Sequence, residues 1–490
     1  MKHHWFKGLA LLLIIFGPRL LSLDRFLTAD EPLFWQHAQA FAAGVSRGDF
    51  GQTLGIGYPG VTVAAWAAPW VAGQDEALAT YAAGRFAVGL LNGLLVLTLV
   101  TLAGRLLGGP AAWTAGVLLA LDPFLLGYSR LLHLEAVLAT LMTLTGVALL
   151  LWLRDGRRLD LLLTGLFLGL ALLTKSTALL LGPMLGLLLL GWAVTTGQWA
   201  RLVWWRHQLL ALGLAVIVAG LIFGLLWPAM WVDPIGTLKL TFGKLLVDQE
   251  AGAGNLGMFW LGRFVEDPGP LFYPVAFLLK ATPWLLVGLA LSLFSLVRVG
   301  KQGAGSREQE VGSREPGSIH NSQFSTRLAL WLFAFTYLIL MTLASKKAIR
   351  YLLPTFPVFY LLAGAALYQL YVGVGRGTWD VGRSAWGVVR RRFISRGRLV
   401  INNEQLVINN EQLTNPTLHP SNPPILQHST LPTFQPPAKA SFGTPPPSSP
   451  ILQPSNPPTF QPPAKASFGT PLPSSPILQS SNPPTSQPPA

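Results

Sequence analysis

The sequence contains no cysteine, and only 11% of its 490 residues are charged. The absence of cysteine excludes disulfide bonds and thiolate metal sites such as zinc fingers. The low share of charge, beside 51% hydrophobic residues and a mean hydropathy of +0.46, excludes an assembly of ordinary soluble domains. This composition is typical of an integral membrane protein.

Apolar stretches about as long as a bilayer's hydrocarbon core is thick recur along the chain. Lys2 and Lys7 stand at the start of the first stretch, but no small-residue cleavage site follows it, so we interpret it as a retained anchor. We expect an all-α polytopic membrane protein with about ten transmembrane helices, at roughly 5–23, 84–103, 111–128, 134–153, 159–174, 176–194, 209–232, 271–297, 328–345 and 351–372.

The net charge of +14 comes from basic residues in short connections between these stretches. Basic residues hold such connections on the cytoplasmic side, so we attribute the charge to membrane orientation rather than to nucleic-acid binding. With Met1 inside, the connections around Arg105, Arg154 and Arg201, the 298–327 connection and the chain after 372 all fall inside. We expect a prokaryotic plasma membrane, both termini in the cytoplasm and the active site outside.

Composition divides the chain into parts, which we expect to be a transmembrane module at 1–372, a basic juxtamembrane segment at 373–399 and a disordered tail at 400–490. Residues 303–326 carry the near-duplicate runs GSREQEV and GSREPGS, which indicate a low-complexity cytoplasmic insertion. The tail holds 23 of the 39 prolines and repeats one 26-residue unit at 434–459 and 460–485, without the apolar periodicity of a solenoid. Either it is a Pro-rich ligand for a partner or it has no function.

Two connections expected outside, 24–83 and 233–270, are long enough to carry a site. The first contains Trp35, Phe41 and Trp66 among short apolar stretches. Aromatic residues gather at membrane interfaces, so we expect helices lying in the interface plane there.

Charged residues next to the outer ends of the spans are the candidate functional groups, because a charge inside the membrane costs about 2.5 to 3.5 kcal/mol. Asp30 and Glu31 follow the first span in TADEPLFWQ, where the alternative role is capping of a helix that starts near Pro32. Lys175 stands in LLTKSTALLL, and its alternative role is snorkelling to the interface.

Three further groups belong to the same surface. The run LDPFLLGYSRLLHLEAVL holds Asp122, Arg130, His133 and Glu135, for which an Arg130–Glu135 ion pair joining two helices is the alternative. The run SKKAIRYLLPTFP holds Lys346, Lys347 and Arg350 on the side where basic residues are disfavoured, unless the topology is mistaken there. The run VEDPGPLFYPVAFLLKATPW carries Glu266, Asp267 and Lys280 and indicates a rigid loop closing over a site.

All five groups fall on one membrane surface, and together they fit one chemistry. A carboxylate is suited to take a proton from an acceptor hydroxyl, and guanidinium and ammonium groups match the oxygens of a lipid-linked phosphate. This is the set of groups needed to transfer a sugar from a polyprenyl phosphate.

The same runs resemble glycosyltransferase family 39, the protein O-mannosyltransferase-like group of the GT-C membrane glycosyltransferases, which includes relatives that transfer aminoarabinose to lipid A. The matching stretches are ADEPLFW, SRLLHLEAVL, LLTKSTALLL, DPGPLFYPVAFLLKATPW and KKAIRYLLPTFP, in the expected order within 1–372. The chain departs from the family in having about ten spans instead of eleven to thirteen, no lumenal insert and the 303–326 insertion.

The resemblance implies a GT-C fold and an inverting transfer from a polyprenyl-phosphate sugar to a protein, lipid or glycan acceptor, with no nucleotide-sugar site. It implies that Asp30 is the general base, with Glu31 and Glu135 as the other catalytic carboxylates. It implies that Arg130 is the arginine of the family's Ser-Arg pair and that Lys175, Arg350 and either Lys346 or Lys347 face the lipid-linked phosphate. From their place in the polar runs, we also expect His133, Glu266 and Asp267 in substrate binding. No cofactor is expected, and a divalent metal is left open. A transporter or lipid flippase, or an inactive relative, are the alternative functions.

Overall fold

The computed structural model describes residues 2–53, 77–239, 257–306, 319–344 and 347–374. These all lie in the first of two compact units, Met1–Glu404. The Pro-rich tail, the centre of the 303–326 insertion, Trp66 and Lys346 lie outside the described residues, so the expectations for them stay predictions.

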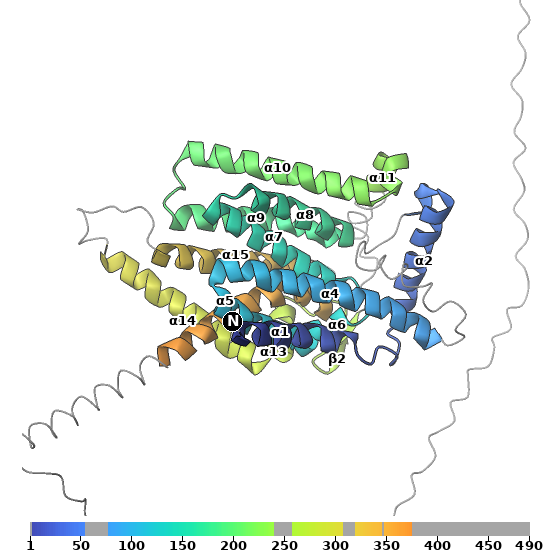
Figure 1. Cartoon of the computed structure of the whole chain (residues 1–490), viewed down its shortest axis with the longest axis horizontal. Coiled ribbons are helices and arrows are strands. Elements are labelled where there is room, and N and C mark those ends of the chain that lie inside the picture. The colour runs from blue at the N-terminus through green and yellow to red at the C-terminus, as the bar shows by residue number, and fades with distance from the viewer. Residues whose placement is uncertain (1, 54–76, 240–256, 307–318, 345–346, 375–490) are drawn as a thin grey trace, which may run out of the picture. The chain divides into compact units, whose positions relative to one another are not determined.

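The described part of the chain is built almost entirely of helices (Figure 1). Its helical elements are α1 (Lys2–Leu20), α2 (Glu31–Arg47), η1 (Phe50–Thr53), α4 (Ala77–Leu107), α5 (Gly109–Ala120), α6 (Pro123–Ser129), α7 (Glu135–Asp155), α8 (Arg158–Thr174), η3 (Ser176–Leu180), α9 (Leu181–Thr195), α10 (Leu202–Leu226), α11 (Ala229–Val232), α13 (Phe272–Lys280), α14 (Pro283–Ser306), α15 (Ile319–Leu343) and η4 (Ile349–Thr355), which continues as a helix over 356–374. The expected all-α polytopic fold is confirmed.

Among the described residues, six helices are long and apolar enough to cross a membrane. The number is eight if each of two bent helix pairs is one span. The ten apolar stretches expected from the sequence are nevertheless all helical over most of their length. The two that this count leaves out lie in α1 and α8, which are 19 and 17 residues long. The difference from ten therefore concerns these two helices and not whether the expected stretches are helical.

Two of the expected spans are broken. The pair α5–α6 bends by 69° and the pair α13–α14 by 117°. Asp122 caps α6 by accepting a hydrogen bond from the Leu125 amide at 2.7 Å, and a proline opens both α6 and α14, where its missing N–H costs nothing. The Tyr360 hydroxyl donates to Asp122 Oδ2 at 2.6 Å and lies 2.9 Å from Thr282 Oγ1, so one side chain joins both breaks.

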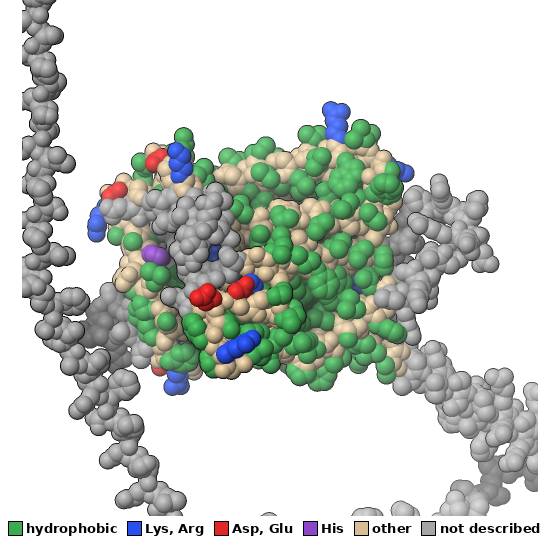
Figure 2. Space-filling view, turned by 180° about the vertical axis from the view of Figure 1, so that it is seen from behind, with side chains coloured by type: hydrophobic (Ala, Val, Ile, Leu, Met, Phe, Trp, Pro, Cys, Tyr) green, Lys and Arg blue, Asp and Glu red, His purple; other side chains and the backbone are tan. Residues whose placement is uncertain are grey.

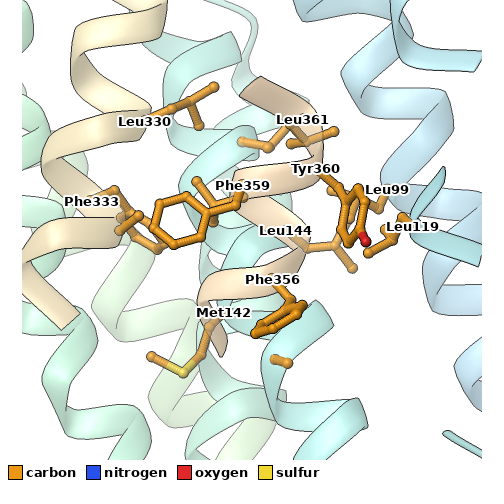
Figure 3. Close-up of a cluster of buried hydrophobic side chains, with 14 of the residues drawn as sticks. Leu99, Leu119, Met142, Leu144, Leu330, Phe333, Phe356, Phe359, Tyr360 and Leu361 are labelled. Atoms are coloured by element: carbon orange, nitrogen blue, oxygen red, sulfur yellow. The ribbon is translucent and has the colours of Figure 1, made fainter. Parts of the chain in front are cut away.

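The core surrounds α7, whose membrane-length window is 89% buried. This helix packs against α4 and α8, and α8 in turn packs against α10. Figure 3 shows how Met142 and Leu144 of α7 lie among the aromatic rings of Phe333, Phe356 and Phe359. Helix α10, by contrast, is only 22% buried, and Figure 2 shows hydrophobic side chains over a broad continuous area, as expected of a surface that faces lipid.

Close contact between α8 and α10 depends on two glycines. A Cβ atom at Gly165 would lie 2.6 Å from the carbonyl oxygen of Ala215, and one at Gly169 would lie 2.7 Å from that of Ala219. Small residues at one face let membrane helices approach closely.

We expect Gly165→Val to separate α8 from α10 and to cost about 1–3 kcal/mol, the usual cost of overpacking. The measurement is the Tm of purified protein in detergent. Gly213→Val is the matched control, because a Cβ at this exposed position of α10 would meet nothing within 4 Å. Equal Tm values for the two variants would contradict the proposed packing role.

Two connections that the sequence analysis expects outside lead into the candidate site. Figure 1 shows α2 running across the direction of α4 and α10 near one of their ends, as expected of an interfacial helix. Its buried face carries Trp35, Ala38 and Phe41, each three residues after the one before. A hairpin of β1 (Met258–Trp260) and β2 (Arg263–Val265) precedes α13, with Met258 paired to Val265.

Candidate active site

Five candidate residues from distant parts of the sequence lie in one continuous network of charges. They stand at the start of α2, in the connection from α6 to α7, at the start of α7, between α8 and η3, and in η4; they are Asp30, His133, Glu135, Lys175 and Arg350. Each stands where a helix begins or is interrupted, because only there can a charge lie close to the membrane without entering a span.

Asp30 is the exposed carboxylate of the network, with 42% of its side chain accessible. Arg350 donates from Nη1 to Asp30 Oδ2 at 2.9 Å, and His133 Nε2 lies 3.4 Å from the same oxygen. The residue occupies the N-cap position of α2, yet its side chain makes no capping hydrogen bond. Arg350 and His133 therefore both face Oδ2, whereas Oδ1 has no hydrogen-bond partner in the described part of the chain.

Glu31 is fully buried, unlike its neighbour Asp30. Its two carboxylate oxygens accept hydrogen bonds from Arg85, from the amide and hydroxyl of Thr28 and from the Leu132 amide. Burial by itself raises the pKa of this carboxyl, but the hydrogen bonds from Arg85, Thr28 and Leu132 outweigh burial and hold the pKa below its ordinary value. Glu31 is thus an ionised anchor whose oxygens are already occupied.

Glu135 pairs with Lys175 rather than with Arg130. The Lys175 ammonium donates to Glu135 Oε1 at 2.5 Å, and Arg350 Nε lies 4.0 Å from the same oxygen. Lys175 also lies over the ring of Tyr351, 4.3 Å from its centroid, so it points into the network instead of snorkelling away. Arg130 donates to the carbonyls of Leu21 and Ser22, and the considered Arg130–Glu135 pair is not formed.

His133 is held in one tautomer. Its Nδ1 accepts a hydrogen bond from the Glu135 amide at 3.2 Å, so the proton of the neutral ring belongs on Nε2, which faces Asp30. The ring packs edge-on against Phe34 and Tyr128. Burial lowers the pKa of the His133 imidazole, with Glu135 and Asp30 opposing this and Arg350 and Lys175 adding to it, which favours the neutral ring.

The remaining candidates form a second, separate contact. Lys347, only 5% exposed, donates to Asp267 Oδ1 at 2.9 Å, and this hydrogen bond lowers the pKa of the Asp267 carboxyl. The contact ties the connection after β2 to the segment that precedes η4. Glu266 is exposed and forms no ion pair with any described residue, and Lys280 lies 5.9 Å from the ring centroid of Phe124.

Arg85 is the residue of this region that sequence reasoning missed. It lies within the first stretch of α4, almost fully buried, and bonds both oxygens of Glu31. An arginine at the start of an apolar run carries no signal of its own in the sequence. Only its partner, 54 residues earlier, shows that it belongs to the site.

The arrangement has a defined chemical capacity. An accessible carboxylate oxygen at Asp30 can accept a proton, while Arg350 and Lys175 supply positive charge a short distance away. In the described residues, no three carboxylate or imidazole groups are grouped so as to hold a metal ion. These side chains can therefore offer a base next to cations that are able to bind an anion.

The fold is of the expected GT-C type. It is similar to ArnT from Cupriavidus metallidurans in the apo state, at 19% identity and TM-score 0.51, and to the same protein bound to undecaprenyl phosphate, at 17% identity and TM-score 0.51. These comparisons cover 75% of this chain and 59% and 60% of the ArnT chains, so the chain spans about three-fifths of their length. A weaker likeness, with 15% identity and TM-score 0.44 over 76% of this chain and 50% of the other, links it to an Archaeoglobus fulgidus oligosaccharyltransferase tethered with an acceptor peptide.

The sequence itself matches one protein family. Residues 68–227 match the family of dolichyl-phosphate-mannose-protein mannosyltransferases, which is 160 of the 490 residues. This range includes Arg85, His133, Glu135 and Lys175 but neither Asp30 nor Arg350. No protein of curated function matches the sequence. The resemblance to membrane mannosyltransferases that the sequence indicated is therefore confirmed.

Proposed function

We propose that the chain is an inverting membrane glycosyltransferase that moves a sugar from a polyprenyl-phosphate donor to an acceptor hydroxyl at the outer membrane surface. In this reaction Asp30 takes the proton of the hydroxyl, and the acceptor oxygen attacks the anomeric carbon of the sugar. The bond from that carbon to the phosphate oxygen breaks, and the polyprenyl phosphate leaves with the electron pair. Attack from the face opposite the phosphate inverts the anomeric configuration.

The observation that carries this proposal is that the two carboxylate oxygens of Asp30 have different surroundings. Oδ2 is occupied by Arg350 and faces His133, so the carboxylate is fixed in direction. Oδ1 has no partner among the described residues, and the side chain is 42% exposed. A general base needs an unoccupied lone pair, and Oδ1 of this partly exposed side chain supplies one.

Positive charge for the leaving phosphate comes from Arg350 and Lys175. Both are held by carboxylates in this structure, Arg350 by Asp30 and Lys175 by Glu135. Phosphate oxygens offer the same charge-assisted hydrogen bonds, so an anionic donor can share or replace these partners. The similar fold of ArnT bound to undecaprenyl phosphate supports a polyprenyl phosphate as the lipid carrier.

The remaining candidates have supporting roles in this proposal. Glu135 holds Lys175 in place, and the Lys347–Asp267 pair fixes the connection that precedes η4, which carries Arg350. The orientation inferred from basic connections puts this surface outside and the chain termini in the cytoplasm. The acceptor is a protein, a lipid or a glycan hydroxyl.

We expect undecaprenyl phosphate to raise the Tm of the purified protein in detergent by several degrees, because a ligand that binds only the folded state stabilises it. Undecaprenol of equal length, which lacks the phosphate, is the control and should have a much smaller effect. Mass spectrometry of lipid that copurifies with the protein should detect a sugar-phosphate polyprenol. Equal shifts with both lipids would contradict phosphate recognition.

The same preparation separates a transferase from a flippase. A transferase releases free polyprenyl phosphate from the detected donor when an acceptor is present, whereas a flippase moves the lipid between leaflets with its sugar–phosphate bond intact. Thin-layer chromatography of the donor after incubation in proteoliposomes reports this difference. Movement of donor without cleavage would overturn the proposed function.

A further inference from the structure

The guanidinium of Arg85 donates five hydrogen bonds, two to a carboxylate and three to backbone carbonyls. Its Nε and Nη2 donate to the two oxygens of Glu31, each at 2.6 Å. The same guanidinium donates to the carbonyls of Leu23 at 2.6 Å, Arg25 at 3.3 Å and Phe26 at 2.7 Å. One planar group near the start of α4 therefore holds both the connection that leaves α1 and the first residue of α2.

Glu31 extends this clamp to a third segment. Its Oε1 accepts from the Leu132 amide at 3.0 Å, and its Oε2 accepts from the Thr28 amide at 2.9 Å. Leu132 directly precedes His133, as Asp30 directly precedes Glu31. The dipeptide 30–31 therefore contacts the dipeptide 132–133 at two points. One is the hydrogen bond from the Leu132 amide to Glu31, and the other is the approach of His133 Nε2 to Asp30 Oδ2.

We propose that Arg85 is a positioning residue for the base: by fixing Glu31, it holds the Asp30 carboxylate in register with His133 and Arg350. This inference rests on the proposed function for its effect on rate, but its structural part stands on the geometry alone. Arg85 touches neither Asp30 nor the cations that face the donor, so it acts through Glu31. Lysine cannot replace it, because an ammonium has three donors and no planar fork for a carboxylate.

The test is Arg85→Lys, with Arg105→Lys as a matched control. Arg105 forms the same two-point contact with Asp160, at 2.6 and 2.7 Å, twenty residues further along α4, which is about 30 Å away at 1.5 Å per residue. We expect Arg85→Lys to lower kcat about 10- to 100-fold, because small displacements of a base are costly. The KM for the donor should change less than about threefold, since Arg350 and Lys175 stay in place. Arg105→Lys should leave both constants unchanged.

A second measurement does not depend on sugar transfer. The chain has no native cysteine, so spin labels can be attached at Gln36 of α2 and Ile349 of η4, both exposed, by introducing two cysteines. Pulsed electron paramagnetic resonance then gives the distribution of distances between α2 and η4. Arg85→Lys should broaden or shift this distribution, and Arg105→Lys should leave it as in the parent protein.

The outcomes separate the two claims. An unchanged distance distribution together with an unchanged kcat in Arg85→Lys would overturn the positioning role. If the parent protein transfers no sugar, the proposed function fails, while the distance distribution still decides the role of Arg85. If Arg85→Lys does not yield monodisperse protein, Glu31→Gln with Arg85→Gln removes both charges together and leaves neither unpaired, and the same measurements apply with the same expectation.

Discussion

We expect Asp30→Asn to abolish sugar transfer while the protein remains folded. Asparagine has the shape of aspartate and still offers an oxygen to Arg350, but its amide cannot take a proton from the acceptor. Loss of a general base lowers rates by about 10²- to 10⁴-fold, so the variant should fall to the detection limit. The measurement is transfer of labelled sugar from a polyprenyl-phosphate donor in proteoliposomes.

Stability and a neighbouring carboxylate provide the controls for this result. The Asp30–Arg350 pair is partly exposed, and such pairs contribute only about 0–1 kcal/mol, so the Tm of Asp30→Asn should stay within a few degrees of the parent value. Asp24→Asn changes an exposed carboxylate of the same connection and should transfer sugar at the parent rate. Full activity in Asp30→Asn would exclude Asp30 as the base.

The sequence was informative about the helices because a bilayer imposes a length on them. All ten apolar stretches are helical in the described residues, and the interfacial character of α2 follows from its buried Trp35 and Phe41. The breaks at Asp122 and Thr282 could not be predicted from hydropathy, because a bent pair of short helices is as apolar as one straight span. Their cause is local: a capping side chain and a following proline.

The site was predictable to the extent that topology placed its charges on one surface. Asp30, Glu135, Lys175 and Arg350 do lie together in the structure, although their roles in catalysis stay predictions. Which charge pairs with which could not be read from the sequence, because it depends on the side-chain directions at helix ends. Arg130 is the example, since it bonds the carbonyls after α1 instead of Glu135.

The contact between Asp30 and Arg350 joins the proposed base to a cation that we propose binds the donor phosphate. Arg350 lies 2.9 Å from Asp30 and 4.0 Å from Glu135, so without a donor its charge is shared between two carboxylates. A bound phosphate competes for the same guanidinium. The bound phosphate is therefore expected to share Arg350 with Asp30, and Asp30→Asn, which removes a competing charge, should bind undecaprenyl phosphate at least as well as the parent protein does.

Arg350→Gln should give the opposite result. Glutamine cannot supply positive charge, and loss of a charge-assisted contact of about 2–5 kcal/mol weakens donor binding by at least tenfold. The Tm increase caused by undecaprenyl phosphate should nearly disappear in this variant, whereas Asp30→Asn retains it and loses only transfer. Arg327→Gln, which changes an arginine of α15 bonded to Ser295, is the control for loss of one guanidinium. If Arg350→Gln kept the full lipid-induced Tm increase, Arg350 would not hold the phosphate, and Lys175 would become the cation to test.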